Sequence, residues 1–307
     1  MSMTRLELFD NLGYKKDPFK GVRLGTGDQA RVKRIITMAV ESHAMVSVVG
    51  ERGIGKSDAI DMALEKYNVR KVVVHRAQKE KITIADIEKA IILDLSDESP
   101  KRGAETCSRQ VRRIIGEASR KTGEHGVKQQ IVLIIEEAQR LHSSTLRSLK
   151  TLREIEWMGE RELFTIILLA QSDPMNRPGV SEVRLRSDLV RMQGMSANEA
   201  GHYIRNILGK HFEGPAIDDL AELPQARNYL ELQEVAIELL NSVLADGREV
   251  VLMEDVKKIS CQNPQPVPKA APRKQAAPIT GSDALKSVLS RTGGVASTGN
   301  IKGAINA

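Results

Sequence analysis

The sequence has few aromatic residues, few cysteines and no long apolar run, and each shortage excludes a class of protein. Aromatic residues make up 3% of the 307 residues, too few for the stacking platforms that bind single-stranded nucleic acids. Cys107 and Cys261 have no metal-ligand spacing and cannot form a disulfide framework, as expected in a reducing compartment. No stretch reaches the roughly 18 apolar residues of a membrane span, and no apolar signal segment opens the chain. We therefore expect a cytoplasmic protein without membrane contact.

The positive charge is concentrated at the C-terminal end. The formal net charge is +6. Residues 262–307 contain six basic residues and one acidic residue, so the preceding part of the chain is nearly neutral. The same segment is rich in Pro, Ala, Gly and Ser and too poor in large apolar residues to fold alone. We expect a flexible basic tail that is either inert or a tether for a partner.

The segment "AMVSVVGERGIGKSDAIDMAL" contains a phosphate-binding loop. A short apolar strand, Met45 to Val49, precedes the pattern G-x-x-x-x-G-K-S at residues 50–57, and an amphipathic helix follows, which is the context that this motif requires. The glycines let backbone N–H groups surround an oxyanion, the lysine reaches the β- and γ-phosphates, and the serine ligates magnesium. The predicted nucleotide-binding residues are Gly50, Gly53, Gly55, Lys56, Ser57 and Asp58.

Two carboxylates end a second apolar strand. In "IVLIIEEAQRL", residues 131–141, a run suited to a strand buried on both faces of a parallel sheet is followed at once by Glu136 and Glu137. Ligands of open α/β sheets bind at that end of the strands. Beside a phosphate loop, Glu136 is predicted to hold Mg²⁺ together with Ser57, and Glu137 to orient or deprotonate the attacking water. The alternative is that the acids only favour a helix N-terminus.

A third apolar strand is followed by another polar group. In "ELFTIILLAQSDPMNRPG" the first polar side chain after the strand is Gln171, which can contact the γ-phosphate or the water; a loop amide without a role is the alternative. Between the last two strands, leucines at helical spacing in "SSTLRSLKTLREIEWMGE" predict a crossover helix. The expected fold is therefore α/β, with a parallel sheet that carries the phosphate loop.

The run "EEAQRLHSSTLRSLKTLREIE…LFTIILLAQSDP…VRLRSDLVRMQGMSANEAGHYI" resembles the AAA+ ATPases of the group that contains the type II secretion ATPase ExeA and the transposition target-selection proteins of Mu-like phages and related transposons. The resemblance covers about residues 6–260. It implies a P-loop AAA+ core over residues 21–195, a small helical lid over 196–261 and a tail over 262–307. The opening "LFDNLGYKKDPFK" is similar to a segment that lies near the adenine in this group, so residues 1–20 are expected there.

The resemblance also implies roles for further residues. Gln171 would be sensor 1, and Arg186 in "VRLRSDLVR" would be an arginine finger that reaches a neighbour's nucleotide, with Arg184 and Arg191 as rivals. Arg227 lies where the group has a sensor 2 arginine, although two residues separate it from the preceding proline. A solvated surface charge is the alternative for each arginine. A finger acting in trans implies a homo-oligomer, either a hexameric ring or a helical filament.

A basic stretch, "SDESPKRGAETCSRQVRRIIGEASRK", points to a polyanionic partner. Its predicted helix carries basic residues on several faces, which suits sequence-independent phosphate contacts with double-stranded DNA; a solvated charged helix is the alternative. The target-selection proteins of Mu-like transposition have a similar segment, which lines the DNA channel of a filament. The predicted DNA-binding residues are Lys101, Arg102, Arg109, Arg112, Arg113 and Lys121.

Together these features predict an ATP- and Mg²⁺-dependent ATPase. The resemblance implies that it assembles on target DNA in a bacterial cytoplasm or a phage-infected cell and recruits or activates a transposase. Two alternatives remain: a secretion-associated ATPase of the ExeA kind, and a helicase-loading or repair AAA+ protein.

Overall fold

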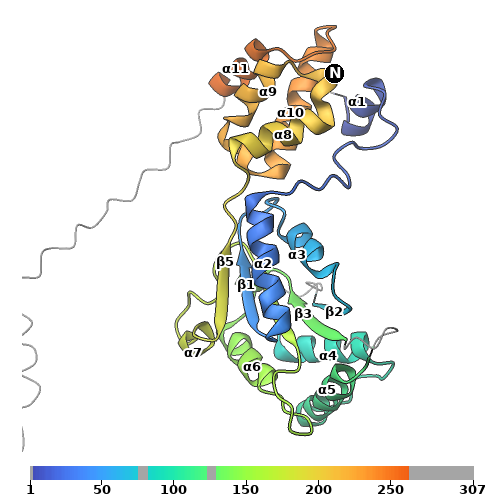
Figure 1. The fold of residues 1–307 in the computed structure, drawn as a ribbon, viewed down its shortest axis with the longest axis vertical. Helices are drawn as coiled ribbons and strands as arrows, with labels where there is room; N and C mark the ends of the chain where they lie inside the picture. The colour runs from blue at the N-terminus through green and yellow to red at the C-terminus, as the bar shows by residue number, and fades with distance from the viewer. Residues whose placement is uncertain (1–2, 75–81, 123–128, 263–307) are drawn as a thin grey trace, which may run out of the picture. The chain divides into compact units, whose positions relative to one another are not determined.

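One parallel sheet forms the centre of the larger part of the molecule. A computed structural model describes residues 3–74, 82–122 and 129–262, so the predicted tail, apart from Gln262, lies outside the described residues. The described strands are β1 (Met45–Val49), β2 (Val69–Val74), β3 (Gln130–Ile135), β4 (Thr165–Ala170) and β5 (Ser187–Arg191). They pair in parallel in the order β2-β3-β4-β1-β5, so the predicted α/β fold is confirmed (Figure 1).

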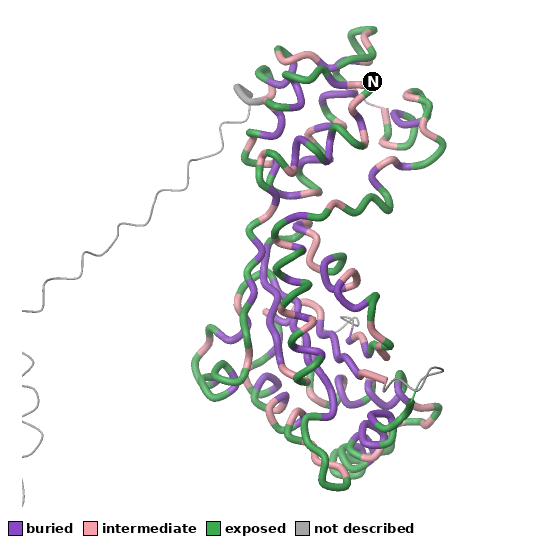
Figure 2. The backbone as a smooth tube through the Cα atoms, in the orientation of Figure 1, coloured by how far each residue is buried: buried purple, intermediate pink, exposed green. Residues whose placement is uncertain are grey.

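The sheet is buried on both faces, as its unbroken apolar runs predict. Successive side chains of a strand point to opposite faces. In β3, Leu133 therefore belongs to the apolar cluster on one face, and Val132 and Ile134 belong to the cluster on the other. Every residue of β1 and β4 is buried, and β1, which Figure 1 labels, runs through the purple interior of Figure 2. Their carboxyl ends therefore deliver the loops beyond them at fixed positions.

Helices cover both faces of the sheet. Residues of α2 (Gly27–Glu41) and α3 (Lys56–Leu64) complete one cluster. Residues of α4 (Ile84–Leu95), α5 (Ala104–Ser119), α6 (Ser143–Arg153) and α7 (Ser181–Arg184) complete the other. The boundaries follow from local chemistry, because Thr26 and Thr83 each form a capping box at the start of α2 and α4.

The predicted crossover helix is α6, but it ends at Arg153 and so excludes Trp157. Trp157 lies in a turn in which its backbone exchanges two hydrogen bonds with Glu160. Its indole packs directly on Gly116 of α5, where a Cβ atom would overlap the ring. The tryptophan therefore joins the end of α6 to α5.

The C-terminal helices form an apolar cluster of their own. They are α8 (Ala197–Leu208), α9 (Gly214–Ala221), α10 (Tyr229–Ala245) and α11 (Met253–Gln262), with 3₁₀ turns at Gly209–His211 and Pro224–Arg227. The N-terminal helix α1 (Arg5–Asn11) contributes Leu8 and Phe9 to the same cluster, and Phe19 follows. The first residues of the chain therefore pack against the last described helices. None of the helices in the described ranges has the length and apolar character that a membrane crossing requires.

Hydrogen bonds from backbone N–H groups to side-chain carboxylates tie the start of α2 to the segment that leads from β5 into α8. The Asp28 carboxylate accepts from the backbone N–H groups of Gln193 and Gly194, at 2.5 and 2.8 Å. The Glu199 carboxylate accepts from Gly27 N at 2.7 Å. Gly194 has a φ of +94° and lies against the Arg227 carbonyl, where a side chain would clash. This connection fixes the direction in which the chain enters the C-terminal helices.

Candidate nucleotide site

The phosphate loop connects β1 to α3, as predicted, and its conformation depends on glycine. Gly53 and Gly55 have φ angles of +85° and +86°, in the left-handed region that residues with a side chain rarely adopt. A Cβ atom on Gly53 would lie 2.5 Å from Asn228 Oδ1, and one on Gly55 would lie 3.2 Å from the Tyr229 ring. The glycines therefore permit both the turn of the loop and the close approach of the start of α10.

Lys56 is the first residue of α3, and its side chain folds back onto the loop that precedes the helix. Its Nζ atom donates to the carbonyl oxygens of Gly50 and Glu51, at 2.8 and 2.7 Å. Burial lowers the pKa of this ammonium group, and the nearby charge of Glu137 partly offsets that effect. An ammonium held by two neutral carbonyl groups is available to a phosphate, which offers stronger, charge-assisted hydrogen bonds.

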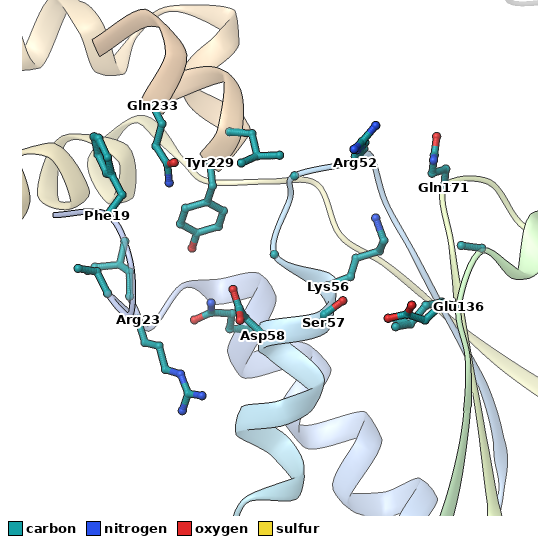
Figure 3. A pocket seen from close by; sticks show the side chains of 18 of the residues that line it. Phe19, Arg23, Arg52, Lys56, Ser57, Asp58, Glu136, Gln171, Tyr229 and Gln233 are labelled. Carbon is teal, nitrogen blue, oxygen red and sulfur yellow. The ribbon is translucent and has the colours of Figure 1, made fainter. Parts of the chain in front are cut away.

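Glu136 and Glu137 follow β3 and reach the same cleft as Lys56. Figure 3 shows Glu136 pointing toward Ser57 and Lys56. Glu137 has a left-handed backbone, with a φ of +50°, and starts a 3₁₀ turn, Ala138–Arg140. Its carboxylate forms an ion pair with Arg140, with 3.0 Å between Glu137 Oε2 and Arg140 Nε.

The cleft has a volume of about 750 Å³ and two chemically distinct ends. One end carries the phosphate loop, the two glutamates, Arg140 and Gln171. The other end is lined by Phe19, residues 21–24, Gln29, Tyr203, Tyr229 and Gln233, which Figure 3 shows in part. Burial raises the pKa of Tyr229 to about 12, so its hydroxyl stays neutral. A polar, charged end joined to an aromatic end suits a nucleotide.

The arrangement fits a nucleotide with Mg²⁺. A hard cation prefers oxygen donors, and the Ser57 hydroxyl and the Glu136 carboxylate face each other from different segments (Figure 3). Lys56 supplies a cation beside the glycine loop. Asp58, one residue into α3, also lines the cleft. The carbonyl oxygen of Gly50 accepts a hydrogen bond from Lys56 and so helps to position the ammonium group.

Gln171 lines the cleft, and a residue that sequence reasoning missed holds it. The backbone N–H of Gln171 donates to Gln139 Oε1 at 3.1 Å. The Arg177 guanidinium donates to the carbonyl oxygens of Gln139 and Leu141. These bonds fasten the segment after β4 to the turn after β3. Gln139 lies only two residues beyond Glu137, so proximity to the carboxylates is the signal that could have found it.

The predicted finger and sensor arginines do not line this cleft. Arg186 forms an ion pair with Glu154. Arg191 forms one with Asp173, with 3.6 Å between Arg191 Nη2 and Asp173 Oδ2. Arg227 is exposed, while the next residues, Asn228 to Leu230, contact the phosphate loop. Asn228 forms a hydrogen bond with this loop: its Nδ2 atom donates to the Arg52 carbonyl oxygen at 2.7 Å. The sensor and finger roles of these arginines stay predictions.

Several of the predicted DNA-binding arginines are engaged within the protein. Arg113 pairs with both Glu98 and Glu117, and its guanidinium holds the pKa of Glu98 below its usual range. Arg109 pairs with Glu105, and Arg112 Nε donates to the Glu156 carbonyl at 2.7 Å. Within the described ranges no ion pair is found for Lys101, Arg102 or Lys121. The cations without an ion pair to another described residue therefore lie at the two ends of the predicted stretch.

The chain has the α/β fold of P-loop AAA+ domains. Residues 40–175 match a family described as "AAA domain", which implies nucleotide binding. No curated protein sequence matches the chain. Among solved structures, the chain is similar to Cdc6p from Pyrobaculum aerophilum, with a TM-score of 0.58 and 14% identity over 85% of this chain and 72% of that one.

Two further structures have the same fold. The ORC2 protein of Aeropyrum pernix, in ADPNP and ADP complexes, gives a TM-score of 0.53 at 14% identity, covering 80% of this chain and 71% of that one. The Drosophila ORC bound to DNA gives a TM-score of 0.53 at 10% identity, covering 76% of this chain and 60% of that one. At these identities the similarity establishes the fold alone.

Proposed function

We propose that the protein binds ATP with Mg²⁺ in this cleft and hydrolyses it. The observation that carries the proposal is that Lys56 and Ser57 from the phosphate loop and Glu136 and Glu137 from the end of β3 line one cleft. Lys56 binds the phosphates, Ser57 and Glu136 hold the metal, and Glu137 accepts a proton from the attacking water. Bound Mg²⁺ would neutralise phosphate charge during the reaction.

Two variants test this assignment. Glu137→Gln keeps the size of the side chain but removes the base, so turnover of ATP should fall by about 100-fold or more while ATP still binds. Lys56→Ala removes the cation that contacts the phosphates, so it should abolish binding as well. Equal turnover in Glu137→Gln and in the unchanged protein would refute the role of Glu137. A matched control is Glu222→Gln, which changes an exposed glutamate outside the cleft.

The proposal extends to oligomerisation. Arg186 lies outside the cleft of its own subunit, beside the short helix α7. In a homo-oligomer, either a ring or a filament, it would leave Glu154 and contact the nucleotide of a neighbour, where an arginine in trans stabilises transition-state charge. Arg186→Ala should then reduce turnover without weakening nucleotide binding to the isolated subunit.

We further propose that the partner is double-stranded DNA. The similar Drosophila ORC is described as bound to DNA. This chain carries the exposed cations Lys101, Arg102 and Lys121, for which no ion pair is found among the residues that the structure describes. Each phosphate contact contributes about 0.9 to the slope of log affinity against log salt. Replacing Lys101 and Arg102 by Ala should therefore lower that slope by about 2. Replacing Lys33 and Arg34, two exposed basic residues of α2, should leave it unchanged.

The most specific form of the proposal is target selection in DNA transposition. It is supported by the order of the motifs "EEAQRL" and "LLAQSDP" and by the basic stretch before β3. ATP binding would build an oligomer on target DNA, hydrolysis at Glu137 would release it, and the DNA-bound form would recruit or activate a transposase. Stimulation of strand transfer by a co-encoded transposase tests this form, whereas secretion or helicase loading would leave transposition unaffected.

A further inference from the structure

Arg140 forms an ion pair with Glu137, the base of the proposed reaction. The 3₁₀ turn after β3 brings the two together. A 3₁₀ helix has three residues per turn, so side chains at i and i+3 lie above one another. The backbone bond from Arg140 N to Glu137 O, 2.8 Å, closes this turn, and the side chains meet at 3.0 Å.

The backbone of this turn is firmly held. Ala138 and Leu141 are fully buried, and Leu141 N donates to Ala138 O at 3.1 Å. The guanidinium of Arg177 binds the carbonyl groups of Gln139 and Leu141 from the segment after β4. Movement in this part of the cleft is therefore left to side chains rather than to the backbone.

The side chains of Glu137 and Arg140 are both partly exposed to solvent. They are 38% and 45% exposed, and an ion pair with this exposure contributes about 0–1 kcal/mol. Both line the cleft beside Lys56 and Ser57. A triphosphate carries more negative charge than a single carboxylate and accepts bidentate hydrogen bonds from a guanidinium. It therefore competes effectively for Arg140.

We propose that Arg140 is a positioning residue that distinguishes a triphosphate from a diphosphate. Without a terminal phosphate it pairs with Glu137 and holds that carboxylate away from the water. With a terminal phosphate it turns to the phosphate and leaves Glu137 available as the base. This inference rests on the proposed function of the cleft, and it makes hydrolysis dependent on the third phosphate through a residue of the same subunit.

Equilibrium binding tests the proposal without depending on turnover. The full-length chain is titrated with a non-hydrolysable ATP analogue and with ADP, each with Mg²⁺. Arg140→Gln should weaken binding of the analogue by about tenfold, the value of one hydrogen bond to a charged group, and change ADP binding by less than about twofold. The matched control is Arg161→Gln, which removes a similar exposed arginine–glutamate pair, with Glu156, outside the cleft.

A second variant makes the test independent of the first. Glu137→Gln removes the charge that competes for Arg140, so the analogue should bind about threefold more tightly while ADP is unaffected. In the double variant Arg140→Gln/Glu137→Gln that gain should disappear. An equal effect of Arg140→Gln on both ligands, or an unchanged gain in the double variant, would overturn the role of Arg140. Failure of the unchanged protein to bind either nucleotide would instead overturn the proposed function.

Discussion

The contact between α10 and the phosphate loop predicts a separable effect on stability and on nucleotide binding. Asn228 is 4% exposed and has two tasks. Its Oδ1 atom caps α10 by accepting from Leu230 N at 3.0 Å, and its Nδ2 atom donates to the Arg52 carbonyl at 2.7 Å. Asn228→Ala removes both bonds, whereas Asn228→Ser keeps a capping hydroxyl on a side chain too short to reach Arg52.

The two hydrogen bonds contribute similar free energies. Loss of the cap costs about 1 kcal/mol, and loss of the bond to Arg52 about another 1 kcal/mol. Asn228→Ala should therefore lower stability by about 2 kcal/mol, and Asn228→Ser by about half of that. Because a loop that is already held loses less conformational freedom on binding, loss of the bond to Arg52 in both variants should weaken ADP binding by up to about fivefold.

Urea denaturation and calorimetric titration with ADP measure the two effects separately. The expected pattern is a smaller stability loss in Asn228→Ser than in Asn228→Ala, with the same loss of affinity in both. Asn228→Ser with the ADP affinity of the unchanged protein would refute the idea that α10 holds the phosphate loop through Asn228.

Three further predictions follow from the packing and the charges. Gly53→Ala should reduce nucleotide binding by more than about 30-fold, because the left-handed backbone and the overlap with Asn228 each cost about 1–2 kcal/mol; binding within a factor of two of the unchanged protein would contradict this. Arg248 lowers the pKa of Asp255 from 3.8 to about 2, so this pair stabilises the fold above pH 3.8 and the stabilisation is lost as the pH falls toward 2. Because the arginine is partly exposed, this stabilisation is about 1–2 kcal/mol of the free energy of unfolding. Asp255→Asn should therefore flatten the low-pH part of a plot of melting temperature against pH, and an unchanged low-pH part would contradict this role of the pair. Gly116→Ala should destabilise the protein by about 1–3 kcal/mol because the new methyl group meets the indole ring; an unchanged melting temperature would show that the turn does not need this packing.

Local patterns were sufficient to predict the parts of the site that lie at strand ends. The phosphate loop could be predicted because its glycines, Lys56 and Ser57 are all contained in one contiguous segment, residues 50–57. Glu136, Glu137 and Gln171 were predicted to come together because the carboxyl ends of parallel strands share one edge of the sheet. The burial of β3 on both faces likewise follows from its unbroken apolar run.

Contacts between distant segments could not be predicted in the same way. Asn228 meets Arg52 across 176 positions of sequence, and its role depends on the angle at which the chain enters α10. Arg227, one position earlier, was the predicted sensor 2 residue. It is exposed, whereas Asn228 is buried against the phosphate loop. The ion pairs Glu105–Arg109 and Arg113–Glu117 were available from i,i+4 spacing, whereas the pairing of Arg113 with Glu98 required the fold.

The most direct test of the central claim is co-sedimentation of the full-length chain with random-sequence duplex DNA at several salt concentrations. The samples contain Mg²⁺ with a non-hydrolysable ATP analogue, with ADP or with no nucleotide. If nucleotide in this cleft controls assembly on DNA, large complexes should form only with the analogue and should weaken steeply as salt increases. Complexes of the same size in all three samples, or no complex in any of them, would contradict the account.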